Sequence, residues 1–126
     1  MNWHKDPDLH HEVEKIVNTL NLSYIDPGRI VVFRSLGSKS RAKARIWSFP
    51  RIWQQALNVS PHYCIEVLEE KFRKLSHDDQ NRVLIHELLH IPKTFSGALV
   101  PHTRRGWTLV REAEILFQKY KRNNED

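Results

Sequence analysis

The sequence predicts an α+β fold in which a small antiparallel or mixed sheet packs against an N-terminal, a central and a C-terminal helix. Apolar residues recur at helical spacing in three stretches, residues 7–20, 76–91 and 109–120. Between the first two stretches lie short runs rich in β-branched and aromatic residues, bounded by turn signals, as is typical of strands. The length of 126 residues suits one hydrophobic core, so we expect a single domain over residues 1–126.

The N-terminal helix is expected over residues 7–20. Asp6 stands at the N-cap position and Pro7 at the first helical position, where each of these residue types is favoured. The apolar residues of this helix share one face: Leu9, Val13, Ile16, Val17 and Leu20. Such a face must pack against other elements.

A hairpin with a basic turn is expected next. Residues 30–33 form a clear β run after the turn signal of residues 26–28, and a second strand is expected at residues 44–47. The segment from Arg34 to Arg45 holds five basic residues and no acidic one. It could contact the phosphates of a nucleic acid, although a basic strand edge also discourages aggregation of the sheet.

Residues 62–68 predict a further strand, with Tyr63, Ile65 and Val67 on one face. We expect this strand to form the rim of a cleft in which an extended peptide pairs with it as an added strand. The aromatic residues around Pro50 are expected to pack into the core: Trp47, Phe49 and Trp53.

The central helix carries a metal-binding motif at residues 86–90. His86 and His90 lie four residues apart, so on a helix both imidazoles can reach one ion. Glu87 lies about 100° round the axis from His86, where its carboxylate can contact a water on that ion. His-Glu-x-x-His is the arrangement of zinc hydrolases. Ser76 predicts the start of this helix and Pro92 its end, two residues after His90.

A catalytic zinc needs a third protein ligand and an open position for water. Cys64 is the only cysteine, so the ligands must be histidines or carboxylates. His102 is favoured, because the Pro- and Gly-containing loop that follows Pro92 can turn back to the motif. Glu112 and Glu114 on the C-terminal helix are the rival ligands, and that helix is expected to end in a polar tail at residues 123–126.

Composition excludes some classes of protein. No run approaches the roughly 20 apolar residues of a membrane span, so we expect no membrane partner. The first residues lack the apolar core of a signal peptide, and a single cysteine cannot form an internal disulfide, so we expect a cytoplasmic protein. The net charge of +5 favours association with nucleic acid or acidic partners without showing it.

The motif and its surroundings resemble known families. Residues 86–90 followed by residues 100–107 look like the SprT-like metallopeptidases, whose helix motif is followed by a loop and a third histidine ligand. Residues 90–97, with Pro101 and His102, are similar to a group of small archaeal and phage zinc metallopeptidases. SprT-like proteins act on proteins, including proteins crosslinked to DNA, and many carry DNA-binding segments that this chain lacks.

The resemblance implies a zincin-like fold, zinc held by His86, His90 and His102, and Glu87 as general base. We therefore expect a zinc-dependent metallopeptidase that acts on a protein or peptide substrate. Three side chains are candidate donors to the oxyanion: Tyr63, Arg104 and Arg105. The alternative is a nucleic-acid-binding or partner-binding module with a structural zinc site, which would recruit a fourth ligand such as a glutamate.

Overall fold

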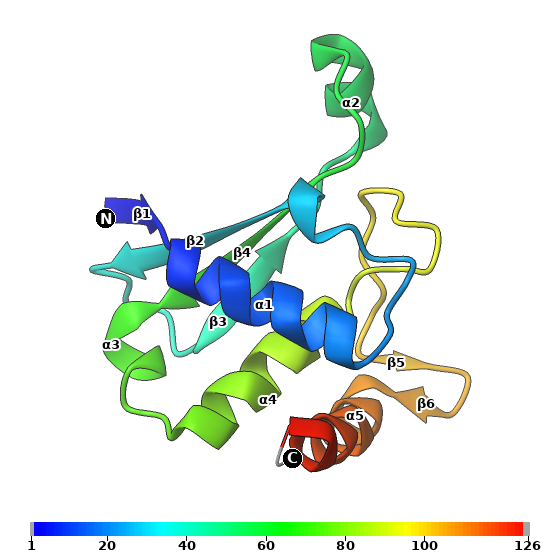
Figure 1. Cartoon of the computed structure of the whole chain (residues 1–126). Coiled ribbons are helices and arrows are strands. Elements are labelled where there is room, and N and C mark those ends of the chain that lie inside the picture. Colours follow the sequence, from blue (N-terminus) through cyan, green and yellow to red (C-terminus); the bar gives the residue numbers. More distant parts are fainter. Residues whose placement is uncertain (1, 125–126) are drawn as a thin grey trace.

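A four-stranded mixed sheet forms the centre of the fold, with the strand order β1-β2-β4-β3 (Figure 1). The computed structural model describes residues 2–124. The strands are β1 (Asn2–Lys5), β2 (Ile30–Leu36), β3 (Ala44–Trp47) and β4 (Tyr63–Leu68). β1 pairs antiparallel with β2, β2 pairs parallel with β4, and β3 pairs antiparallel with β4. The predicted α+β class with a mixed sheet is confirmed.

The described residues also form five α-helices and a short 3-10 helix. The helices are α1 (Pro7–Thr19), η1 (Pro27–Arg29), α2 (Arg51–Leu57), α3 (Glu69–Phe72), α4 (His77–Leu88) and α5 (Leu109–Asn124). A second, two-stranded sheet pairs β5 (Thr103–Arg104) with β6 (Trp107–Thr108). Figure 1 shows α1 lying across the sheet with α4 on the same side, so these two helices cover one face of the sheet, and α5 packs against both helices.

The predicted N-terminal helix is confirmed as α1. The side chain of Asp6 accepts a hydrogen bond from the backbone N–H of Leu9, which caps the helix. The same carboxylate forms an ion pair of 2.7 Å with Arg34 on β2, while Arg34 also pairs with Glu69 on α3. This pairing fixes the start of α1 against the sheet. β1, which precedes α1, was not predicted.

The predicted hairpin of residues 30–33 and 44–47 is wrong. β4 lies between β2 and β3 and is hydrogen-bonded to both. The reason lies in burial, since every residue of β4 except Cys64 is buried, and a strand so apolar on one face takes the central position. The expected role of residues 62–68 as a cleft rim is also wrong, because β4 has no free edge. β3 is the edge strand instead.

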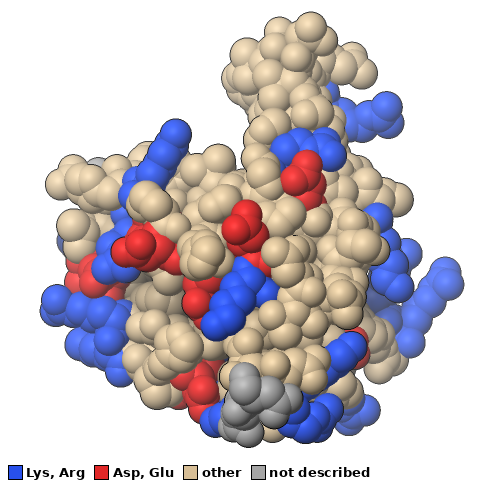
Figure 2. All heavy atoms as spheres, in the orientation of Figure 1, with Lys and Arg blue, Asp and Glu red and all other residues tan. Residues whose placement is uncertain are grey.

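The expected packing of Trp47 and Trp53 into the core is also wrong, since these side chains are 49% and 55% exposed. Trp53 belongs to α2, which projects from the body of the molecule (Figure 1) and carries few charged side chains (Figure 2). The expected polar tail at residues 123–126 is helical as far as Asn124, and residues 125–126 lie outside the described residues.

The core lies between the sheet and the helices that cover it. Its fully buried residues come from α1, β2, β4, α4 and α5, and include Ile16, Ile65, Leu84 and Phe117. No helix within residues 2–124 is long and apolar enough to cross a membrane.

Glu66 is the buried charge of the sheet, and it lies on the face that the helices leave open. Its side chain is 2% exposed, and its carboxylate accepts hydrogen bonds from Arg45 Nε at 2.9 Å, Trp47 Nε1 at 2.9 Å and Trp3 Nε1 at 3.2 Å. Burial acts to raise the pKa of Glu66, but hydrogen bonds from Arg45, Ser35 and the two indoles outweigh it and lower the pKa to about 2. This network ties the edge strands β1 and β3 to β4.

The low pKa of Glu66 predicts that acid weakens the fold through this residue. The folded-state value of about 2 lies below the ordinary value of 4.5, so the stabilisation is complete above pH 4.5 and is lost as the pH falls toward about 2. The loss should be on the order of 3 kcal/mol. Urea unfolding over this pH range measures it. Glu66→Gln should have a lower free energy of unfolding at neutral pH, and that free energy should change less with pH in acid. Glu14→Gln, on the surface of α1, is the control and should behave like the parent. The same pH dependence of stability in the parent and Glu66→Gln would contradict this account.

Candidate metal centre

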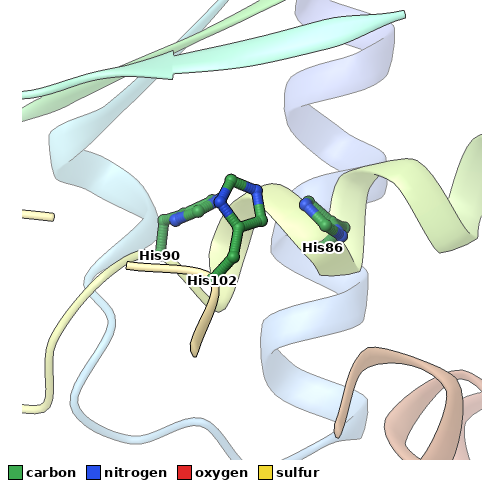
Figure 3. Close-up of side chains that lie close together, drawn as sticks. All are labelled: His86, His90 and His102. Carbon is green, nitrogen blue, oxygen red and sulfur yellow. The ribbon is translucent and has the colours of Figure 1, made fainter. Parts of the chain in front are cut away.

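Three histidines from two parts of the chain come together beside α4 (Figure 3). His86 lies on α4, His90 in the turn after it, and His102 directly before β5. One nitrogen from each ring lies within 4.8 Å of the others, and the ring centroids are 4.6 to 5.4 Å apart. These distances suit three ligands of one metal ion.

α4 is held in place by its cap and its buried face. Ser76 Oγ accepts a hydrogen bond of 3.1 Å from the N–H of Asp79, as the sequence predicts. Leu84, Ile85 and Leu88 are almost fully buried against the sheet and neighbouring helices. Burial of this face turns His86 toward the opposite side, where the ion would lie.

The helix ends at Leu88, two residues before His90, and not at Pro92 as expected. The N–H of His90 bonds to the carbonyl of Glu87, and that of Ile91 bonds to the carbonyl of Leu88, both with a three-residue spacing. Bonds of this spacing form a tighter, 3-10-like turn that continues the helical path of the chain beyond the end of α4. It keeps the ring of His90 near that of His86, so the motif retains its geometry although the regular helix has ended.

His90 is also bonded twice to Val100. Its Nδ1 lies 2.7 Å from the carbonyl of Val100, and the N–H of Val100 bonds to the carbonyl of His90 at 2.7 Å. Nδ1–H donation to a carbonyl leaves Nε2 free for a metal, which is the usual support for a histidine ligand. The two bonds close the loop after α4, and His102 follows only two residues later. The sequence predicts that the loop returns to the motif, but it does not predict the hydrogen bonds between Val100 and His90.

The loop is anchored further by β4. The hydroxyl of Tyr63 donates to the carbonyl of Ala98 and accepts from the N–H of Gly97, each at 2.8 Å. Gly97 has φ +94°, and a Cβ there would lie 2.3 Å from the carbonyl oxygen of Phe49, so only glycine fits. Tyr63 is 1% exposed, and the expectation that it donates to an oxyanion is therefore wrong.

The other expected oxyanion donors do not line the cleft of the histidines. Arg104 and Arg105 are exposed on the β5–β6 hairpin, and Arg104 lines a neighbouring cavity with Trp107. The basic side chains that line the histidine cleft include Lys43 and Arg82. No sequence pattern indicates that Lys43 and Arg82 line the same cleft, because their proximity depends on how β3 is placed over α4.

The two rival ligands have other neighbours. Glu114 forms an ion pair of 3.0 Å with Arg82 and accepts a hydrogen bond from Gln118. Glu112 lines a separate cavity that includes Tyr24. Within residues 2–124, no carboxylate or thiol joins the group of His86, His90 and His102.

Glu87 lies beside the histidines and lines the same cleft. It is 7% exposed, and one of its carboxylate oxygens has no hydrogen-bond partner. Burial raises the pKa of Glu87 from 4.5 to about 7. Burial, with smaller effects of His90 and His102, lowers the pKa of His86 to about 4, so its imidazole is neutral and able to bind a metal. The donor set and the unpaired carboxylate oxygen thus fit a metal ion with a water beside it.

A cleft of about 650 Å³ opens over this group. Residues 42–46, which include most of β3, form one side, and residues of α4 form the other. Leu99 and His102 lie at its end. The edge strand β3 therefore borders the candidate metal centre.

Comparison with known proteins identified a family. The model of the family described as "Putative phage metallopeptidase" matches residues 1–122, which include all the strands, the three histidines and Glu87. No curated protein and no solved structure matched the chain.

If three histidines hold the ion, His102→Ala should lower the metal content of the purified protein, and Glu112→Ala should not. Loss of one of three ligands leaves two imidazoles, which bind a divalent ion far less tightly. Elemental analysis after dialysis measures the metal bound per chain. Glu114→Ala is a second control, because it removes an ion pair with Arg82 and leaves the histidines untouched. Undiminished metal in His102→Ala would remove His102 from the ligand set.

Proposed function

Since the chain belongs to the family described as "Putative phage metallopeptidase", we propose that it hydrolyses peptide bonds with a zinc ion held by His86, His90 and His102. The observation that carries this proposal is the meeting of three ring nitrogens within 4.8 Å, beside the buried carboxylate of Glu87. The chain offers this arrangement in a cleft large enough for an extended peptide.

Zinc is the metal we propose because the ligands are neutral imidazoles. Three histidines and an open fourth position form a frequent ligand set of catalytic zinc. A structural zinc site would need a fourth protein ligand, and no carboxylate or thiol within residues 2–124 joins the group. When bound, the ion acidifies water and polarises the carbonyl of the scissile bond. The likeness to SprT-like metallopeptidases stays a prediction from the sequence.

Glu87 is the proposed general base. Its carboxylate takes a proton from the attacking water and passes it to the amine that leaves when the C–N bond breaks. A group that accepts and then donates a proton works best when its pKa lies near the working pH, and burial raises the pKa of Glu87 to about 7. The carboxylate oxygen without a partner is free for this role.

The edge strand β3 is the proposed docking site for the substrate backbone. β3 lines the cleft and pairs only with β4, so its outer edge can accept another strand. The N–H of Leu68 bonds to the carbonyl of Lys43. Hydrogen-bonded and non-hydrogen-bonded pairs alternate in antiparallel strands, so this bond indicates that Ala44 and Ile46 direct their backbone groups away from β4.

Glu87→Gln tests the proposed chemistry. The amide keeps the size of the side chain but cannot accept the proton of water, so peptide hydrolysis should fall roughly 10²- to 10⁴-fold while the bound metal is unchanged. Release of fluorescent peptides from a quenched library measures hydrolysis, and elemental analysis measures the metal. Glu112→Gln, on a separate cavity, serves as the control and should stay active. A Glu87→Gln protein as active as the parent would rule out this mechanism.

Ala44→Pro tests the proposed docking edge. Proline removes the outward N–H of residue 44 without removing a bond to β4, so KM for extended peptides should rise several-fold, as expected when one hydrogen bond of about 1 kcal/mol is removed. The metal content should not change. Ala44→Val keeps the N–H and adds bulk at the same position, which separates removal of the donor from crowding. Equal KM values for Ala44→Pro and Ala44→Val would argue against pairing at this edge.

A further inference from the structure

The sheet has a second face, opposite to α1 and α4, whose side chains the proposed peptidase does not use. The strand registers align one residue from each strand in a single row: Lys5, Phe33, Glu66 and Arg45. Alternate residues of β2, β4 and β3 lie in the core or pack against it: Val32, Ile65, Val67, Ala44 and Ile46. The row therefore faces away from the helices.

Two indoles lie on either side of this row. Trp3 pairs with Ser35, which lies two residues after Phe33 on β2. Trp47 pairs with Cys64, which lies two residues before Glu66 on β4. Both donate Nε1–H to the carboxylate of Glu66, which draws their edges toward the centre of the sheet. Their side chains are nevertheless 56% and 49% exposed. The rings are thus held in place from beneath while about half of their surface stays open.

A cavity of about 320 Å³ lies between the indoles. Its lining is Trp3, Phe33, Trp47, Cys64 and Glu66. No residue lines both this cavity and the cleft of the three histidines. Trp47 lines the cavity, whereas Ala44 and Ile46 lie at the core and the cleft. Arg45 also lines the cleft, while its guanidinium binds Glu66 of the cavity.

The chemistry of the cavity favours a flat ring over a cation. Glu66 is the only acidic residue in the lining, and Arg45 and the two indoles already occupy its carboxylate. A positively charged ligand would therefore find no unpaired negative charge. Aromatic rings at fixed positions instead offer stacking with little loss of side-chain entropy.

The surroundings of the cavity are basic. Lys5 is exposed at the end of the row, next to Phe33 of the cavity lining. The loop between β2 and β3 exposes Lys39, Arg41 and Lys43, of which Lys43 also lines the cleft of the histidines. None of these four forms an ion pair within the described residues, whereas Arg34 and Arg45 of the same segment do. On the face that carries α1, by contrast, Figure 2 shows acidic and basic side chains side by side. The unpaired positive charge of Lys5, Lys39 and Arg41 is complementary to a polyanion.

We propose that this outer face of the sheet binds single-stranded nucleic acid, with bases stacked on Trp3 and Trp47 and phosphates contacted by Lys5, Lys39 and Arg41. Stacking platforms bordered by basic side chains are the usual means of holding a single strand without reading its sequence. A duplex keeps its bases stacked on each other and cannot enter the cavity.

Fluorescence anisotropy of labelled oligo-dT and oligo-U tests the proposal. Trp3→Ala and Trp47→Ala should each weaken binding about 5- to 150-fold, which is the usual effect of removing the aromatic partner of one stacked base. Trp53→Ala is the matched control, because Trp53 is equally exposed but belongs to α2 outside the cavity. Comparison of the affinities for oligo-dT and oligo-U shows whether DNA or RNA is preferred.

Both tryptophan variants also remove a donor to buried Glu66 and so lower stability. Lys39→Ala and Arg41→Ala leave this network intact, and each should reduce the salt dependence of binding by about 0.7 in log–log slope, because each removes one cation that pairs with a phosphate. Quenching of tryptophan fluorescence by oligo-dT in the parent protein should accompany binding. His102→Ala should bind the oligonucleotide like the parent, which separates this site from the peptidase.

Three results would overturn the proposal. The first is no binding of either oligonucleotide at low salt, and the second is equal affinity for a duplex of the same length. The third is a dimer in sedimentation that Trp47→Ala dissociates and Trp53→Ala does not, because the cavity would then be an interface between two copies of the chain.

Discussion

The central position of β4 is the constraint on which the rest of the structure depends. Because β4 is hydrogen-bonded on both sides, each of its residues has a fixed face. Tyr63 points to the helix side and holds the loop that delivers His102. Glu66 points to the open side and holds two indoles and Arg45. One strand thus organises both the metal cleft and the outer cavity, and a shift of one residue in its register would exchange the two sets of side chains.

Local patterns predicted much of this protein because they act within one element. The cap at Ser76, the buried face of α4 and the pair of histidines all follow from residues close in sequence. The order of the strands does not, because pairing of β2 with β4 depends on which apolar faces find each other across more than 30 residues. The prediction of a hairpin between residues 30–33 and 44–47 is wrong for that reason. The exposure of Trp47 was missed because its donation to Glu66 involves another strand.

The closed loop explains how a third histidine can be supplied without a regular element to carry it. Hydrogen bonds at two places hold this loop in the way that a helix would: two join His90 and Val100, and two join the hydroxyl of Tyr63 to Gly97 and Ala98. Ordering a loop costs conformational entropy, and here much of that cost is met when the chain folds. The ring of His102 then needs little further ordering when a metal binds, which favours a tight site on an exposed segment.

β3 separates two environments with only four residues, and its sequence suits both. Ala44 and Ile46 face the core and the cleft, where the small side chain of Ala44 would leave room for the peptide that we propose to pair with this edge. Arg45 and Trp47 face outward, where a large planar side chain and a guanidinium pair with Glu66. Side chains alternate along the strand, but Arg45 lines the cleft while its guanidinium binds Glu66 of the cavity. A change at Arg45 would therefore act on both surfaces, and a ligand on either one would contact the backbone of the same strand.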